Sequence, residues 1–64
     1  RQAVALFERA VKLGNVTAAE NLGRTYQYGL GVRADRGRAI RWYMTAEDMG
    51  STHATEALRA LHEK

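Results

Sequence analysis

Apolar residues recur at helical spacing in four successive segments of the chain. In the first segment they occupy positions 3, 6, 7, 10, 11 and 13. These positions lie on one face of an α-helix, whereas a half-buried strand would alternate apolar and polar residues. Proline, which would interrupt a helix, is absent from the sequence.

Residues that favour helix ends separate these segments. Glycines at positions 14, 29 and 50 can adopt the left-handed conformation that terminates helices. Asn15 or Thr17, Asp35, and Ser51 or Thr52 can cap the helices that follow. The pattern predicts an all-α fold of four helices, at about residues 2–13, 16–28, 36–49 and 52–63, joined as antiparallel hairpins.

The second half of the chain repeats the first at an offset of 36 positions. The aligned pairs are small or apolar residues: Ala3 with Ala39, Phe7 with Tyr43, Ala10 with Ala46, Gly14 with Gly50, Ala18 with Ala54 and Leu22 with Leu58. Positions between them differ mainly in polar residues, as expected for a retained packing core with variable outer faces. A repeat of this length predicts a helical solenoid in which successive units stack in a row.

The repeat also indicates which residues form the core. Alanines at positions 3, 10, 18, 19, 39, 46, 54 and 57 are expected to face inward and let the helix axes approach closely. Larger side chains are expected to fill the space between them, namely Leu6, Phe7, Leu22, Tyr26, Trp42 and Tyr43.

The residues that carry this pattern resemble the Sel-like repeat, a helix-hairpin repeat related to the tetratricopeptide repeats. They are Ala18, Leu22, Gly23, Tyr26, Gly29, Gly31, Val32, Asp35, Ala39, Trp42, Ala46, Gly50, Ala54 and Leu58. The resemblance implies an α-solenoid that binds proteins or peptides and has no catalytic chemistry. Residues 1–64 are then one segment of such a solenoid, an excerpt of something longer. One full repeat occupies about residues 15–50, between two half-repeats. Arg59 stands where the family has glycine, which suggests a capping-like last helix.

A polar stripe on the second helix is the first candidate binding site. By helix geometry Thr17, Glu20, Arg24, Gln27 and Tyr28 lie well away from the buried Leu22, and Arg24 can pair with Glu20 or stack on Tyr28. Tyrosine and arginine dominate interface hot spots. The resemblance implies that this helix lines the concave side of the solenoid, with His53 and Glu56 as the repeat-related partners. The stripe predicts a protein-binding surface, or alternatively an ordinary solvated face.

An arginine cluster is the second candidate site. It consists of Arg33, Arg36, Arg38 and Arg41, interrupted by Asp35. Cations are unfavourable in the first turn of a helix, so the cluster suggests an acidic partner or an anion, unless the arginines simply pair with Asp35. Ten Lys and Arg against seven Asp and Glu give a net charge of +3, below that of a dedicated nucleic-acid binder. Nucleic acid is therefore not the expected partner.

Other classes of function find little support in the composition. There is no cysteine; His53 and Glu56 share one helix face, but His62 falls on the opposite side, so we expect no metal or other cofactor. Ser51 and His53 lack a residue to orient the base, and we expect no enzyme activity. The longest apolar run is Ala3–Phe7, too short for a membrane span. The outer helices each lack a neighbour, so the alternative function is a structural segment that forms homo-oligomers by end-to-end stacking.

Overall fold

A computed structural model describes residues 2–62, and these form four α-helices without any strand: α1 Gln2–Lys12, α2 Val16–Tyr28, α3 Arg36–Asp48 and α4 Thr52–His62. The predicted all-α class is confirmed, and so are the predicted helices, whose ends differ from the observed ones by at most one residue. The predicted end of the last helix, residue 63, lies outside the described residues.

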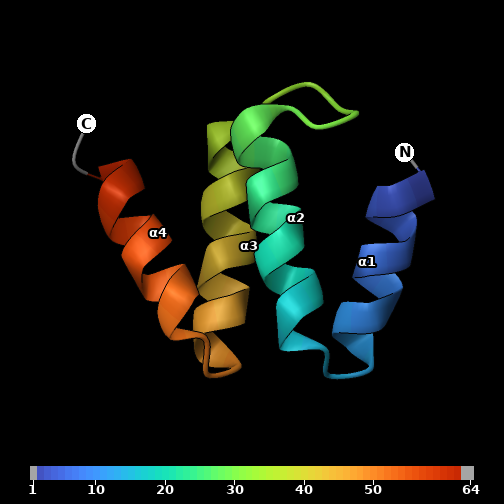
Figure 1. Cartoon of the computed structure of the whole chain (residues 1–64), viewed down its shortest axis with the longest axis horizontal. Helices are drawn as coiled ribbons and strands as arrows, with labels where there is room; N and C mark the ends of the chain where they lie inside the picture. The colour runs from blue at the N-terminus through green and yellow to red at the C-terminus, as the bar shows by residue number, and fades with distance from the viewer. Residues whose placement is uncertain (1, 63–64) are drawn as a thin grey trace.

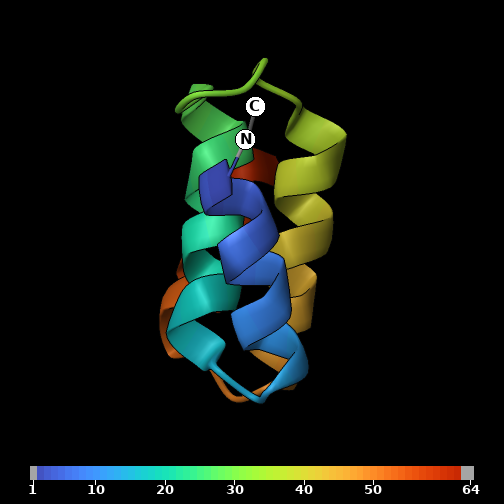
Figure 2. The same ribbon diagram turned by 90° about the vertical axis from the view of Figure 1, so that its right-hand side faces the viewer.

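The four helices stand side by side in a row, each antiparallel to the one before it (Figure 1). The Cα atoms span 30 × 26 × 13 Å, which is the flat outline of a row. The packed pairs are the consecutive ones, with the most extensive contact between α2 and α3. From the α1 end, α1 stands in front of both α2 and α3 (Figure 2). The arrangement is therefore an α-solenoid of helix hairpins, because α1 and α4 lie at opposite ends and enclose no common interior.

Side-chain caps fix where the helices begin. The Asn15 Oδ1 accepts a hydrogen bond from the Ala18 N–H at 3.0 Å, and the Asp35 Oδ1 accepts one from the Arg38 N–H at 3.1 Å. The Ser51 Oγ accepts the Ala54 N–H at 3.0 Å. Each bond satisfies a backbone donor at a helix N-terminus. Of the predicted alternatives, the structure selects Asn15 over Thr17 and Ser51 over Thr52.

The core lies mainly between α2 and α3, with smaller contributions from the outer helices. Its fully buried members are Ala19, Leu22, Ala39, Ala46 and Ala54, joined by the nearly buried rings of Tyr26 and Tyr43. Phe7 and Trp42 pack against this core and are half-buried.

Two core predictions were wrong, and both concern α1. The Leu6 side chain is 63% exposed, and Ala3 is exposed as well. The reason is that α1 lies at the end of the row and packs mainly against α2. Val4, Phe7 and Val11 form its inward face, and Leu6 projects from the helix on another side.

A tight contact between helices occurs where Gly23 of α2 faces the Tyr43 ring of α3. A Cβ atom at position 23 would lie 2.7 Å from ring carbons of Tyr43, well inside the van der Waals limit. Tyr43 is 3% exposed, so its ring has little room to move. Glycine is therefore required here for packing. The repeat-related position on α4 holds Arg59, which is exposed.

Gly23→Ala is expected to destabilise the fold by roughly 1–3 kcal/mol, because the added methyl group overpacks the α2–α3 contact. Gly37→Ala is the matched control, since a Cβ at position 37 meets nothing closer than 3.4 Å. This control is expected to keep or raise stability, by at most about 1 kcal/mol from helix propensity. Urea unfolding followed by circular dichroism measures both. Equal midpoints for Gly23→Ala and the parent chain would show that the close approach is unimportant.

Candidate protein-interaction surface

Part of the predicted stripe borders a hollow between α2 and α4. Glu20 and Arg24 from α2, His53, Ala54 and Ala57 from α4, and Tyr43 from α3 line this hollow, whose volume is about 390 Å³. Three of the seven stripe residues, Glu20, Arg24 and His53, are thus brought together. The other four, Thr17, Gln27, Tyr28 and Glu56, do not line it.

The Glu20 carboxylate connects the two helices. Its Oε2 accepts a hydrogen bond from the Ser51 hydroxyl, and the same hydroxyl oxygen caps α4 by accepting the Ala54 N–H. The His53 Nδ1 lies 3.9 Å from this carboxylate, within ion-pair distance when the imidazole is protonated. Glu20 therefore holds the start of α4 against α2, a role that its helical spacing alone did not reveal. Bonds to a charged group are the stronger hydrogen bonds.

The buried Tyr43 of α3 holds one residue of the stripe in place. Its hydroxyl donates a hydrogen bond to the Gln27 Oε1 at 2.7 Å, and this bond leaves the Gln27 amide nitrogen as a free donor. Burial raises the pKa of the Tyr43 phenol above its ordinary value of 10.0, and the nearby Tyr28 and Glu20 raise it further while Arg24 opposes them. Sequence reasoning placed Tyr43 only in the core, because the 36-position repeat shows packing and not polar contacts.

Arg24 and Tyr28 are exposed members of the stripe. Arg24 is exposed and, among residues 2–62, forms neither the expected ion pair with Glu20 nor a stack on Tyr28. The Tyr28 side chain is 63% exposed. Both side chains therefore remain free to contact a partner, together with the exposed Thr17, His53 and Glu56.

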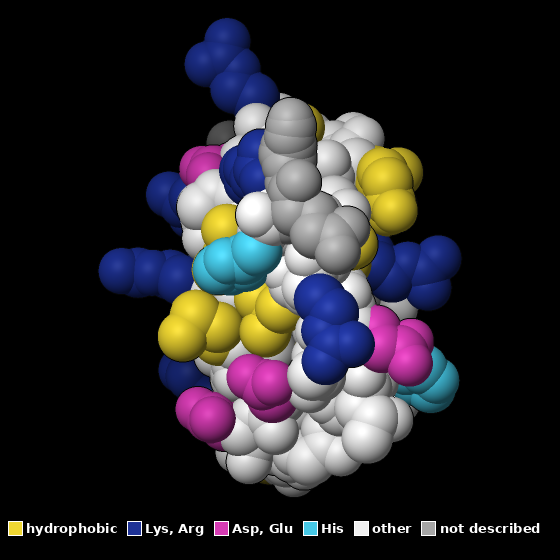
Figure 3. Space-filling model, turned by 90° about the vertical axis from the view of Figure 1, so that its left-hand side faces the viewer, with side chains coloured by type: hydrophobic (Ala, Val, Ile, Leu, Met, Phe, Trp, Pro, Cys, Tyr) yellow, Lys and Arg dark blue, Asp and Glu magenta, His cyan; other side chains and the backbone are white. Residues whose placement is uncertain are grey.

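Viewed from the α4 end, apolar side chains are scattered among acidic, basic and histidine side chains (Figure 3). An interaction surface of this kind depends on polar contacts as well as on apolar burial.

The four arginines of the cluster do not form one patch. Arg36 donates a hydrogen bond to the Leu61 carbonyl at the far end of α4. The Arg38 Nε lies 3.3 Å from the Asp35 carboxylate, and its guanidinium carbon lies 5.7 Å from the centre of the Tyr26 ring. Arg41 borders a hollow between α1 and α3, and Arg33 borders one beside Val4 and Val32; Arg38 lines both hollows. The predicted pairing with Asp35 thus holds for one arginine, Arg38.

Within residues 2–62, no group of three or more His, Cys, Asp and Glu side chains is arranged to hold a metal ion. In the same part of the chain, no helix combines the length and the apolar character needed to cross a bilayer.

Comparison with known proteins identifies relatives of this chain. The sequence profile described as the Sel1 repeat matches residues 1–15 and 16–51. The chain is 36% identical over 61 residues to the DAP3-binding cell death enhancer 1 of Rattus norvegicus, an alignment that covers 95% of this chain and 12% of that protein. The chain thus spans about an eighth of the length of this relative. No solved structure matches with significance.

The contacts of Tyr43 predict how stability changes at high pH. Because the folded state holds the phenol proton more tightly than the unfolded chain, the contribution of Tyr43 is complete below pH 10 and is lost as the pH rises above it. Tyr43→Phe is expected to be about 1 kcal/mol less stable than the parent at pH 7, because it lacks the hydrogen bond to Gln27. Between pH 9 and 11 it should lose less additional stability than the parent, because it has no phenol to ionise. Urea midpoints across this range measure both effects. If the urea midpoints of Tyr43→Phe and the parent chain fell in parallel between pH 9 and 11, the raised pKa of Tyr43 would be contradicted.

Proposed function

The chain belongs to the Sel1 repeat family, whose helical repeats generally mediate protein–protein interactions, and we propose that it presents the concave stripe on α2 and α4 to a peptide or partner protein. The observation that carries this proposal is the exposure of Arg24 and Tyr28 on a helix held rigidly from behind by the Gly23–Tyr43 contact. We propose a role in binding, with no catalytic step.

Affinity on such a surface comes from pre-organisation and a few anchors. The helix α2 is fixed on one side by α3 and at its start by the Glu20–Ser51 bond to α4, so little order is lost when a partner binds. Arg24 and Tyr28 are the proposed anchors, because arginine and tyrosine are enriched at hot spots. Thr17, Gln27, His53 and Glu56 add polar contacts around them, and Glu20 contributes mainly by holding α4.

We propose the same repeat register that the sequence predicts, with one full unit over about residues 15–50. In this register α2 and α3 form one hairpin, while α1 and α4 belong to neighbouring units. The two profile matches, which divide between residues 15 and 16, support it. The stripe then crosses a junction between two units, since His53 and Glu56 belong to the following one.

The rat relative is consistent with a protein partner, since its name describes it as DAP3-binding. This chain corresponds to 12% of that protein, so the name supports protein binding as a class of function and does not identify a partner here.

Structural self-association is a second candidate function, favoured by the outer faces of the row. Leu6 is 63% exposed on α1, and Leu58 and Leu61 of α4 are half-buried. A second copy could cover these faces by end-to-end stacking. Arg59 opposes the tightest form of stacking on α4, because it occupies the position at which Gly23 admits the Tyr43 ring.

Nucleic-acid binding is the weakest candidate. It requires the arginines at positions 33, 36, 38 and 41 to act together, whereas Arg36 is bonded to the Leu61 carbonyl and Arg38 is partly neutralised by Asp35.

Arg24→Ala and Tyr28→Ala are each expected to weaken binding of a protein partner about tenfold, which corresponds to about 1.4 kcal/mol. The partner is first isolated with the parent chain by crosslinking, and affinities are then measured by calorimetry with purified components. Arg59→Ala, an exposed arginine on α4, is the matched control and is expected to bind within about twofold of the parent. Helical circular dichroism should be unchanged in all three. Parent-like affinity in both stripe variants would reject the stripe.

Self-association is tested by sedimentation velocity across a range of concentrations. If end-to-end stacking operates, the chain should form dimers or larger species at micromolar concentration, and Leu6→Gln should shift them towards monomer because it removes an exposed apolar side chain. A parent chain that remains monomeric throughout would count against this function.

A further inference from the structure

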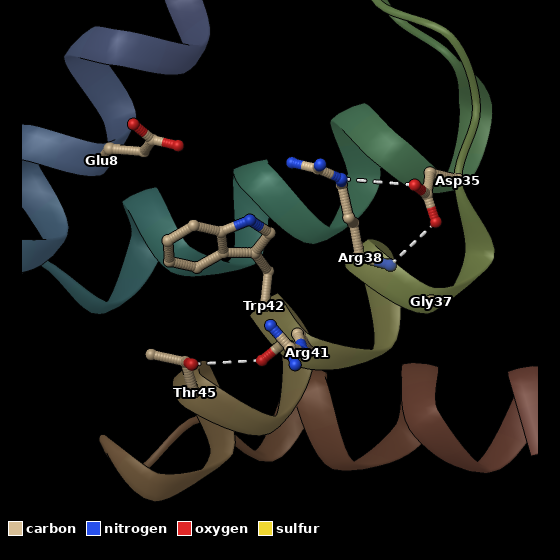
Figure 4. Close-up of a pocket in the computed structure, with 7 residues that line it drawn as sticks. All are labelled: Glu8, Asp35, Gly37, Arg38, Arg41, Trp42 and Thr45. Carbon is tan, nitrogen blue, oxygen red and sulfur yellow. Dashed lines mark hydrogen bonds and ion pairs between the residues drawn. The ribbon is translucent and has the colours of Figure 1, made fainter.

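The hollow between α1 and α3 is distinct from the concave stripe. Its volume is about 590 Å³, and its walls come from Glu8 on α1 and from Asp35, Arg38, Arg41, Trp42 and Thr45 at the start and middle of α3 (Figure 4). It shares no residue with the hollow between α2 and α4. A ligand here would therefore contact a different surface from that of the proposed function.

Two of the charged groups in this hollow are already committed. The Asp35 carboxylate accepts the Arg38 backbone N–H at 3.1 Å and lies 3.3 Å from the Arg38 Nε. Arg38 thus uses one edge of its guanidinium group for this pair and retains its terminal nitrogens as donors. Asp35 acts as the cap of α3, and its charge is balanced locally.

The remaining charges have no such partner. Among residues 2–62, neither Arg41 nor Glu8 lies within ion-pair distance of an opposite charge. The Thr45 hydroxyl donates a hydrogen bond to the backbone carbonyl of Arg41. This bond does not involve the Arg41 guanidinium, which stays free. With Asp35 already paired, the hollow offers the donors of two guanidinium groups and faces one carboxylate, that of Glu8, across the gap.

Trp42 forms the wall between these charges. Its ring lies between Glu8 and Arg38 in the view of Figure 4. The side chain packs against the core and is half-buried, so part of it faces the hollow. In the described residues the indole N–H has no hydrogen-bond acceptor, and an indole usually gains one when a partner covers it.

We propose that this hollow binds an acidic segment of a partner protein, with a carboxylate on Arg41 and the adjoining apolar side chain on Trp42. The free Arg41 guanidinium supplies charge-assisted hydrogen bonds to the carboxylate, and Arg38 adds positive charge to the same hollow. The net charge of +3 attracts an acidic segment at longer range. Glu8 repels carboxylates on the α1 side and so directs the acidic residue towards α3.

Nucleic acid fits this hollow less well. A phosphate backbone needs a continuous row of cations, whereas here Glu8 and Asp35 interrupt the arginines and Arg36 is bonded to the Leu61 carbonyl at α4.

The chain contains one tryptophan, Trp42, so its fluorescence reports on this hollow directly. The probe is a capped peptide with a leucine between acidic residues, compared with the same peptide carrying the corresponding amides. The acidic peptide is expected to change Trp42 emission, and its affinity should fall about tenfold in Arg41→Gln, which removes a charged hydrogen bond. In Glu8→Gln the affinity should rise several-fold, because the repulsive charge is gone.

Arg59→Gln is the matched control, since it removes the same charge from an exposed site on α4. It should bind within about twofold of the parent, and all variants should keep the parent's helical circular dichroism. Equal losses in Arg41→Gln and Arg59→Gln would show non-specific attraction and overturn the proposal. An unchanged Trp42 emission would also overturn it, as would loss of binding in Arg24→Gln but not in Arg41→Gln. Tighter, strongly salt-dependent binding of a single-stranded oligonucleotide would replace it with a nucleic-acid site. Of these outcomes, only the one with Arg24→Gln concerns the concave stripe, because it would place the acidic peptide there; the others leave the proposed function, which is tested separately, untouched.

Discussion

The ring of Tyr43 occupies the space that any side chain at position 23 would need. This contact fixes how α2 and α3 slide and rotate against each other, and the buried alanines on both helices allow the same close approach along their length. Successive residues on a helix point about 100° apart. Once the Tyr43 ring is seated against Gly23, the adjoining Trp42 must therefore face a different side of α3. The positions of both candidate surfaces therefore depend on the contact between Gly23 and the Tyr43 ring.

Several polar groups between the helices hold neighbouring helices together. Ser51 caps α4 and also donates to Glu20 of α2, so a single hydroxyl begins a helix and attaches it to its neighbour. Tyr43 similarly fills the core with its ring and holds Gln27 with its hydroxyl. Because an unsatisfied buried polar group is costly, these bonds favour one arrangement of α4 and α3 on α2 over nearby alternatives. A charge used in this way is less available to a partner, which is why we propose Arg24 rather than Glu20 as an anchor.

The sequence predicted features that depend on local signals and missed those that depend on distant neighbours. Helix periodicity, glycines and caps lie within a few residues of one another, and the helices were accordingly predicted to within one residue. Whether Leu6 is covered depends on how many helices pack around α1, which no local pattern states. The bond between Ser51 and Glu20 joins residues 31 apart, beyond the reach of helical spacing. The arginines looked like one cluster because they are close in sequence, yet their directions around α3 send Arg36 towards α4 and Arg41 towards α1.

In the proposed repeat register, both hollows lie at junctions between consecutive units. The hollow between α2 and α4 would join the first helices of two units, and the one between α1 and α3 the second helices of two units. Neither could exist in a single hairpin, so stacking creates both candidate surfaces, whereas the core lies mainly within the α2–α3 hairpin. The backbone repeats, but the side chains at the junctions do not: 36 positions after Arg24 stands Ala60, and after Glu8 stands Met44. Since the packing residues are retained while these positions vary, each junction can acquire its own specificity without disturbing the fold. Two surfaces without a shared residue can also be occupied together, and a partner that reached both would gain affinity through its effective concentration.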